Sequence, residues 1–267
     1  MEPTQAILLM RRAVAHLANN IIELPSALDV NRVLSALDAI SRSMVVPHLQ
    51  LVHLKTGGII CHAGEKLLNT YFPVTAGISL QYVAGDIRTL STAEIGHEGV
   101  VCDDVIGGAT QRRVIVYRGG FAYRMSGRRF ADVAEASAAF RRQIFLCMQM
   151  ILAQASRVML CSRHHAVRHQ LCRWLLIAHE RSRSIEIPVT HGILAQMLGV
   201  RRETVSEMTR QLQELRLISQ HRGTIVLTDV VGLDRQGCDC HRAIRDESRR
   251  ILAVDENRTP MGSHGPV

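Results

Sequence analysis

The chain has 267 residues, of which 47% are hydrophobic and 21% are charged, a balance that is typical of folded globular proteins and excludes a disordered chain. Its formal net charge of +8 favours a polyanionic partner such as nucleic acid. Only Lys55 and Lys66 are lysines, so almost all of the positive charge is Arg, which suits bidentate contacts to phosphate or guanine but is equally consistent with codon usage.

Residues 1–30 are predicted to form an N-terminal helical extension, because Met10, Val14 and Leu17 fall on one helical face that ends before Pro25. The apolar run at its start is too short for a signal sequence, and no other apolar run reaches the length of a membrane span. The cysteines are scattered and odd in number, which agrees with a reducing compartment. We therefore expect a cytoplasmic protein with no membrane contact.

Residues 31–135 are predicted to form a β-roll, or jelly-roll-like, sensor domain. A short helix over 31–43 precedes several short apolar runs that are broken by Gly. Alternating apolar and polar residues at 78–82 predict a strand that ends at the hairpin turn Gly85-Asp86. A second hairpin is predicted around Gly119-Gly120, and further strands are predicted over 59–61, 71–72, 114–117 and 121–123.

Residues 136–162 are predicted to form one long helix, since this stretch contains neither Gly nor Pro. Apolar residues form two stripes along it, one starting at Phe140 and the other at Phe145. A helix that is apolar on two sides needs a partner on each. The alternative is a helix buried in the core of a single domain.

Residues 163–232 are predicted to form a winged helix-turn-helix, which completes an α+β chain. A helix over 163–183 leads to Thr190, whose side chain can cap a second, short helix. Gly199 can adopt the positive φ that a tight turn between two crossed helices needs. The next helix is predicted to bury an apolar stripe made of Val205, Met208, Leu212 and Leu215.

The runs 217–220 and 224–227 flank a turn that contains Gly223, and this pattern predicts a β-hairpin wing. The alternative for the whole motif is an ordinary helical hairpin with a solvated polar face. Residues 233–267 are assigned to a C-terminal helix, predicted over 231–251, and a tail.

The polar face of the helix after Gly199 carries side chains that can read base edges. An α-helix fits the major groove, where Arg can bond guanine and Glu can accept from cytosine N4. Thr190, His191, Arg201 and Arg222 are the candidates for phosphate contacts. The full set of candidate DNA-binding residues is Thr190, His191, Arg201, Arg202, Glu203, Thr204, Ser206, Glu207, Arg210 and Arg222.

The run Gly199-Val200-Arg201-Arg202-Glu203-Thr204-Val205 resembles the signature that opens the recognition helix in the Crp/Fnr superfamily of bacterial transcription regulators. The resemblance extends over roughly residues 31–250 and is weaker in the front half, where Gly64-Glu65, Tyr71-Phe72-Pro73 with Gly77, and Gly96-His97-Glu98-Gly99 match. It implies a cyclic-nucleotide-binding-type sensor domain and a transcription regulator that binds double-stranded DNA, with RNA polymerase as a candidate further partner.

The resemblance also implies a homodimer, because the long helix of the family packs on its own sensor domain and on its twin. Arg202 and Glu203 match the family residues that read a G·C pair, whereas Glu207 stands where relatives have a third reader, Arg. The residues predicted to form the dimer interface are Phe140, Ile144, Cys147, Met148, Ile151, Ala155 and Val158.

The sequence departs from the family at the ligand site. Nucleotide-binding members grip the cyclic phosphate with an Arg-Ser or Arg-Thr pair, but here neither Arg112 nor Arg113 is followed by a hydroxyl residue. Glu98 matches the Glu that contacts the ribose. We therefore expect the sensor fold without gating by a cyclic nucleotide.

Two groups of residues suggest a metal site weakly. Cys238-x-Cys240-His241 has suitable donors, but a helix would place these residues on different faces. Cys61-His62 with His97 has no further support, so no metal and no other cofactor is expected.

The chain shows no Gly-rich phosphate loop, HExxH or G-x-S-x-G motif and is not expected to be an enzyme. The alternative function is a small-molecule- or metal-binding sensor whose helix-turn-helix contacts proteins.

Overall fold

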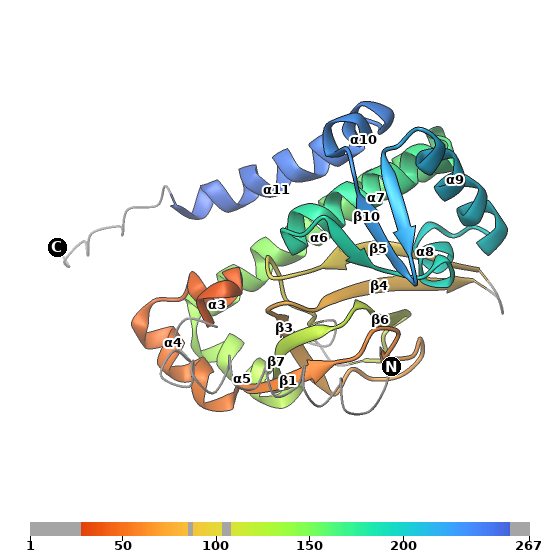
Figure 1. The fold of residues 1–267 in the computed structure, drawn as a ribbon. Coiled ribbons are helices and arrows are strands. Elements are labelled where there is room, and N and C mark those ends of the chain that lie inside the picture. Colours follow the sequence, from red (N-terminus) through yellow and green to blue (C-terminus); the bar gives the residue numbers. More distant parts are fainter. Residues whose placement is uncertain (1–27, 85–87, 103–107, 257–267) are drawn as a thin grey trace, which may run out of the picture.

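The computed structural model describes residues 28–84, 88–102 and 108–256 of the chain. The predicted helix in the N-terminal extension and the predicted turn at Gly85-Asp86 lie outside these residues. Within them the chain has the predicted α+β architecture, in which a sensor domain of antiparallel sheets, a long helix and a C-terminal winged helix-turn-helix follow one another (Figure 1).

The sensor domain consists of two antiparallel sheets that lie in two layers (Figure 1). Their inner faces hold the apolar residues of the alternating strands, such as Phe72, Ile78 and Leu80, all fully buried. One sheet has the order β1 (Gln50–Leu54), β7 (Gly120–Ser126), β3 (Asn69–Pro73), and the other has the order β2 (Ile59–Cys61), β6 (Arg112–Arg118), β4 (Gly77–Ala84), β5 (Arg88–Ile95).

The predicted hairpin around Gly119-Gly120 is wrong, because β6 and β7 belong to different sheets. The two glycines instead form the corner at which the chain crosses between the layers. A Cβ on Gly119 would lie 2.9 Å from the Thr56 hydroxyl, and a Cβ on Gly120, whose φ is +158°, would lie 2.7 Å from Ala76 N. Glycine is needed here for the close approach of two backbones, which a sequence pattern does not distinguish from a turn.

Short helices flank the sheets. The single helix predicted over 31–43 is two helices, because the Asp38 side chain accepts from Ser41 N and starts a new one. A 3₁₀ turn and a further helix also lie next to the strands. These elements are α3 (Arg32–Ser35), α4 (Ala39–Val45), η2 (Val46–His48) and α5 (Gly127–Ala136).

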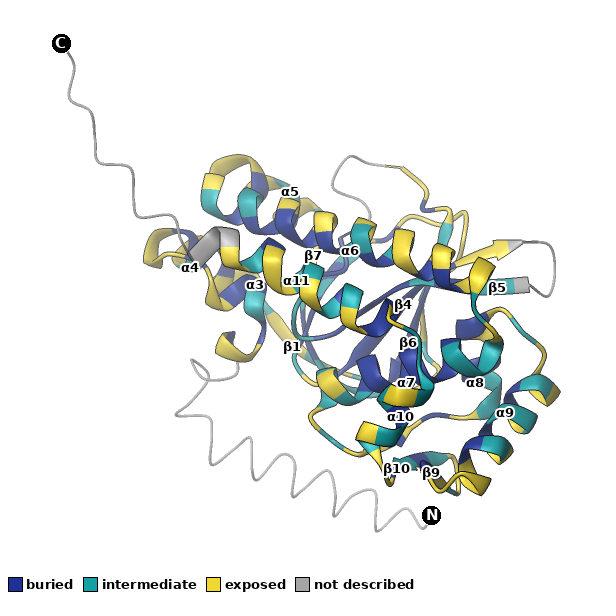
Figure 2. Cartoon of the chain, turned by 90° about the horizontal axis from the view of Figure 1, so that it is seen from above, coloured by how far each residue is buried: buried dark blue, intermediate teal, exposed yellow. Residues whose placement is uncertain are grey.

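The long helix α6 (Ala138–His164) begins at Ser137, whose side chain accepts from Phe140 N. Its first apolar stripe packs inside the chain, as Figure 2 shows by the contrast between its buried and exposed sides. This contradicts part of the predicted dimer interface. Of its seven residues, Phe140, Ile144, Cys147 and Val158 are buried against the chain's own core, and Ile151 is partly buried there.

The second stripe of α6 is open to solvent. Phe145 is 62% exposed and Leu152 is 68% exposed, and Met148 and Met159 continue the stripe. By length and composition alone α6 could cross a membrane, contrary to the expectation that no apolar stretch reaches that length. Because one side of the helix already belongs to the core, we interpret its apolar composition as that of a core helix with a second face to cover.

The C-terminal domain is built on α7 (Val167–Ser182), whose Trp174 and Leu175 are buried. Its small sheet has the order β8 (Glu186–Pro188), β10 (Thr224–Leu227), β9 (Ile218–His221), and β8 was not predicted. The predicted helix over 231–251 is broken at 237–239 into α10 (Val230–Gln236) and α11 (Cys240–Glu256), and α11 lies along α6 (Figure 1).

Candidate nucleic-acid interface

The helix-turn-helix consists of α8 (His191–Leu198) and α9 (Arg202–Glu214). Thr190 caps α8 as predicted, accepting from Ile193 N at 3.2 Å. Gly199 has a φ of +68° and ends α8, and Val200 N donates to Ala195 O. Leu194, Leu198 and Val205 are buried between the helices. These contacts fix how α9 projects from the domain.

The wing is the hairpin β9–β10, with its turn at Arg222 and Gly223. Both turn residues have positive φ, +42° and +82°, which is the requirement of a two-residue turn whose twist matches the strands. The turn holds Arg222 at the exposed tip, where it is available to a phosphate backbone. The third strand, β8, supports the wing through pairs from Thr224 to Val226.

The prediction that α9 buries Leu215 is wrong, because Leu215 is 48% exposed. The helix ends at Glu214, and Arg216, with a φ of +58°, turns the chain towards the wing before a further residue can complete the stripe. Thr209 is buried instead, and its hydroxyl donates to Val205 O at 2.8 Å. An intrahelical hydrogen bond of this kind lets a polar residue occupy a core position, which the apolar pattern did not indicate.

His191 joins the three parts of the motif. Gln220 of β9 donates to its Nε2 at 2.6 Å, so Nδ1 carries the proton and donates to the Ser206 hydroxyl at 2.8 Å. Ser206 in turn donates to Arg202 O at 3.1 Å. The ring of His191 and the hydroxyl of Ser206 are thus engaged inside the motif, although both residues were predicted as DNA contacts.

The outer face of α9 is open. Arg201, Arg202 and Glu203 are exposed around its first turn, where a recognition helix approaches base edges. Further along, Glu207 accepts from Arg210 at 2.7 Å, and this hydrogen bond lowers the pKa of the Glu207 carboxyl. Arg210 also pairs with Glu214. The charge of Arg210 is therefore partly neutralised by neighbours on its own helix.

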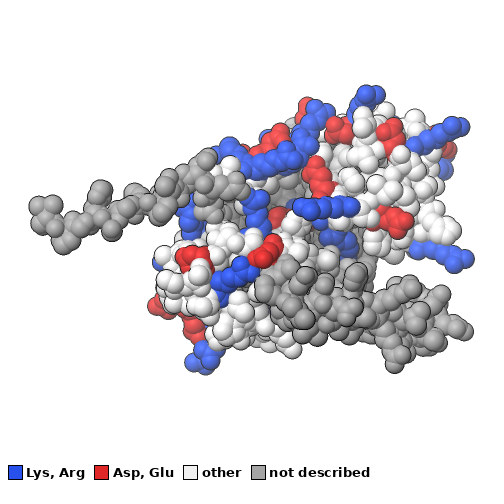
Figure 3. All heavy atoms as spheres, turned by 60° about the vertical axis from the view of Figure 1, so that its left-hand side comes forward, with Lys and Arg blue, Asp and Glu red and all other residues white. Residues whose placement is uncertain are grey.

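On the face in Figure 3, Lys and Arg side chains are interleaved with Asp and Glu among the described residues. Phosphate and base contacts are made by individual side chains, so the residues around α9 and the wing bear on nucleic-acid binding more directly than the overall charge.

The residue that matches the ribose-contacting Glu is already paired. Arg181 of α7 bonds Glu98 at 2.7 Å and lies 3.8 Å from Glu94, while Gln154 of α6 bridges Arg181 and Glu94. Burial would raise the pKa of Glu98, but the charge of Arg181 and the amide of Gly96 outweigh it and lower that pKa. The Glu98 carboxylate is thus held by a residue of the DNA-binding domain.

Other contacts also join the two domains. Arg113 donates to Gln81 of β4 and to Gln196 of α8, at 2.6 and 3.1 Å. Trp174 of α7 packs edge-on against Tyr117 of β6, with ring centroids 5.6 Å apart. The ring of Tyr117 requires Gly77, since a Cβ there would lie 2.4 Å from it. The winged helix therefore rests directly on its own sensor domain.

A groove of about 300 Å³ lies between the sensor sheet and α6. Arg112 is the one charged residue among the described residues that line it, and it has polar contacts of its own. The rest of the lining is mainly apolar and includes Leu80, Ile95, Val100, Met148 and Leu152.

The fold and this interface define a two-domain protein in which a β-roll sensor is joined through a long helix to a winged helix-turn-helix. Residues 169–236 match the Crp-like helix-turn-helix domain family. No curated protein is detectably similar in sequence to the chain.

Several solved structures share the architecture. FixK2 from Bradyrhizobium japonicum has 16% identity and a TM-score of 0.62, covering 71% of this chain and 98% of its own. The c-di-GMP responsive global regulator CLP from Xanthomonas campestris has 16% identity and a TM-score of 0.59, and the match covers 71% of this chain and 99% of that regulator. A CRP/FNR-family transcriptional regulator from Thermus thermophilus has 18% identity and a TM-score of 0.59, and the match covers 70% of this chain and 97% of that regulator.

Residues 169–236 therefore match a Crp-like helix-turn-helix domain, and the chain as a whole has the same fold as these solved structures. The resemblance stated from the sequence is confirmed at this level.

Proposed function

We propose that this protein is a sequence-specific DNA-binding transcription regulator that acts in the cytoplasm. The observation that carries the proposal is the open outer face of α9, with Arg202 and Glu203 exposed in its first turn on a Crp-like helix-turn-helix. Side chains in this position reach base edges when the helix enters the major groove. RNA polymerase is a candidate further partner.

The protein binds DNA as a homodimer in this proposal, with the exposed stripe of α6 as the contact between the two copies. The operator is then a two-fold palindrome with half-sites about one helical turn apart. Phe145, Met148 and Leu152 replace the buried residues of the sequence prediction as the core of this contact. Of the earlier interface residues, Met148, Ala155 and part of Ile151 remain accessible on α6.

The candidate DNA contacts divide into three roles. Arg202 and Glu203 read a G·C pair, and Glu207 either accepts from cytosine N4 or orients Arg210, to which it is already bonded. The phosphate backbone of the DNA is contacted in this proposal by Arg201 and Arg222, together with Thr190 at the start of α8 and Thr204 on α9. His191 and Ser206 position α9 against α8 and the wing through the hydrogen bonds they share.

We expect Arg202→Ala to weaken binding to the cognate operator by about 1–3 kcal/mol per half-site and to relax discrimination at one base pair, because a bidentate contact to guanine is lost. Arg222→Ala is the matched control in the wing. It should weaken binding to cognate and scrambled duplexes alike. The slope of the logarithm of the binding constant against the logarithm of the salt concentration should become shallower by about one unit. The measurement is a titration of both variants on both duplexes across a salt series. Equal losses on the two duplexes for Arg202→Ala would make Arg202 a phosphate contact.

The rival function, a sensor whose helix-turn-helix contacts proteins, is separated by a gel shift with random genomic fragments at stated salt concentrations. A regulator selects a subset of fragments and retains them as salt rises, because base contacts are less salt-dependent than phosphate contacts. A protein-binding module selects none.

The absence of gating by a cyclic nucleotide is also part of the proposal. We expect cyclic AMP and cyclic GMP to show no saturable binding at micromolar concentrations in calorimetry. Glu98 is held by Arg181 and Arg113 is held by Gln81 and Gln196, so a cyclic phosphate would have to displace contacts between the domains. Each charge-assisted hydrogen bond that a ligand fails to make costs about 1.5–3 kcal/mol. Micromolar binding would show that these pairs open for the ligand.

A further inference from the structure

Four potential metal ligands converge at the end of α6. They are Cys161 in its last turn, His165 at its C-cap, Cys238 in the connection from α10 to α11, and Cys240 at the start of α11. Their ligand atoms all lie within 4.8 Å of one another. We infer that Cys161, His165, Cys238 and Cys240 bind one tetrahedral zinc ion, which fastens the α10–α11 connection to the junction between the long helix and the DNA-binding domain.

The backbone explains how these residues meet. Cys161 and His165 are four residues apart at a helix end, and so lie on the same side of it. The break between α10 and α11 leaves Cys238 outside the helix that begins at Cys240, so helical spacing does not separate the two thiols as the sequence suggested. Asp239, between them, points into solvent with its side chain 94% exposed. His241 lies elsewhere, 3.0 Å from Glu180.

Two of the distances between ligand atoms match a single ion, and the remaining ones, all within 4.8 Å, would shorten when the ion binds. Zinc binds sulfur at about 2.3 Å and nitrogen at about 2.0–2.1 Å, which gives a tetrahedron edges of roughly 3.5–3.8 Å. The Sγ atoms of Cys161 and Cys238 are 3.6 Å apart, and Cys240 Sγ is 3.5 Å from His165 Nδ1. The first distance is far beyond the about 2.05 Å of a disulfide. An iron–sulfur cluster distributes its cysteines over several irons and needs wider spacing.

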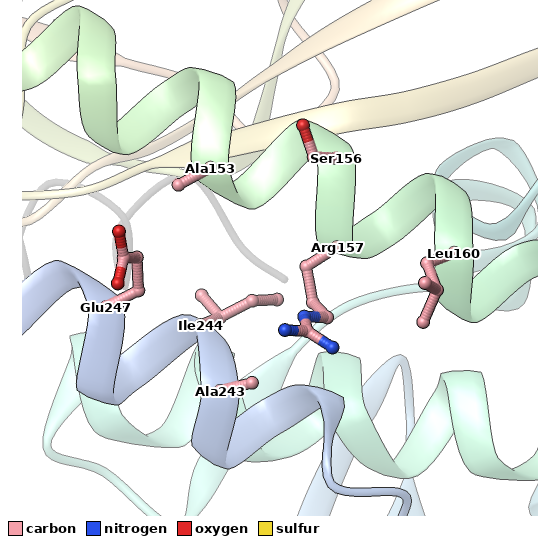
Figure 4. Close-up of a pocket in the computed structure, with 7 residues that line it drawn as sticks. All are labelled: Ala153, Ser156, Arg157, Leu160, Ala243, Ile244 and Glu247. Carbon is pink, nitrogen blue, oxygen red and sulfur yellow. The ribbon is translucent and has the colours of Figure 1, made fainter.

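A groove next to α6 also borders this region. Arg157, one turn before Cys161, lines a groove of about 360 Å³ between α6 and α11 and points across it (Figure 4). Beside this groove Val158, Ile177 and Ile244 form the small apolar cluster that joins α6, α7 and α11. The ion would add a fixed link to the contact between these three helices.

The test is the metal content of the full chain, purified in reducing buffer from zinc-supplemented medium without chelators. We expect one zinc per chain by elemental analysis. Cys161→Ser and Cys240→Ser should each weaken zinc binding at least tenfold in competition with a chromogenic chelator. Cys172→Ala is the matched control, because Cys172 is also buried but is not among the four ligands; it should retain the zinc.

Cobalt reports the ligands without relying on any variant. Wild-type protein stripped by a chelator should take up one Co²⁺ with the intense ligand-field bands of a tetrahedral thiolate site, and His165→Ala should shift those bands. Stripping should lower the melting temperature, and zinc but not magnesium should restore it. No stoichiometric uptake by the reduced protein, a Cys161–Cys238 disulfide, or iron with acid-labile sulfide would overturn the inference. None of these readouts involves DNA, so they stand apart from the proposed function.

Discussion

Replacing Arg181 with Met should lower the free energy of unfolding by about 3–5 kcal/mol, because removal of one partner from a buried ion pair leaves the other charge without compensation. Arg181 has a side chain 12% exposed and bonds Glu98 at 2.7 Å. Its loss would also leave Glu94, 3.8 Å away and 2% exposed, facing an apolar replacement. The measurement is urea unfolding followed by Trp174, the one tryptophan of the chain.

The loss of stability should come from the broken Arg181–Glu98 ion pair, and a double-mutant cycle tests this. Arg181→Met combined with Glu98→Gln should be less destabilised than the sum of the single variants, since the uncompensated carboxylate is gone. Arg183→Met, on an exposed neighbour, should change stability by less than about 0.5 kcal/mol. Additive losses in the cycle would show that Arg181 acts through packing alone.

The pH dependence has a definite sign. The folded-state pKa of Glu98 is lowered, so its contribution is present above the ordinary carboxyl value of about 4.3 and is lost as the pH falls through the folded value. Wild-type protein should therefore lose stability more steeply in acid than Glu98→Gln. A parallel acid dependence of the two proteins would contradict this assignment.

The same ion pair shows why the arrangement of the domains was not predictable. Arg181 and Glu98 are far apart in sequence, and Glu98 matched a ligand-binding position by motif alone. Local chemistry did define the helix-turn-helix. Thr190 needs only its own oxygen and the amide of Ile193 to cap a helix, and Gly199 needs only its missing Cβ to turn the chain. Such features are determined within a few residues.

The predictions that failed concern segments whose sequence is compatible with more than one packing partner in the fold. The glycines at 119 and 120 permit a turn or a corner, and the sheet pairing decides between them. The two stripes of α6 are both apolar, so periodicity shows that two faces need cover but not which face the chain covers itself. Cys161 and Cys238 are 77 residues apart, and their approach depends on a helix break that apolar spacing did not indicate.

The open stripe of α6 leads to the last large effect. Leu152→Glu should convert the proposed homodimer to a soluble monomer. Burial of a Leu side chain is worth roughly 1.5–3 kcal/mol, two-fold symmetry doubles this to about 3–6 kcal/mol, and a buried carboxylate adds to the cost. The dissociation constant should therefore rise at least about 100-fold. Because Leu152 is 68% exposed in the single chain, the change should leave the fold of the protomer intact.

Sedimentation equilibrium across the micromolar range is the measurement, and Leu68→Glu is the matched control. Leu68 is 72% exposed and lies in the sensor domain before β3, away from the stripe on α6, so the same change of chemistry there should leave the dimer unaffected. Phe145→Glu, on the same stripe, should reproduce the effect of Leu152→Glu. A wild-type protein that sediments as a monomer at these concentrations, or a Leu152→Glu variant that remains dimeric, would mean that something other than a second copy of the chain covers this face of α6.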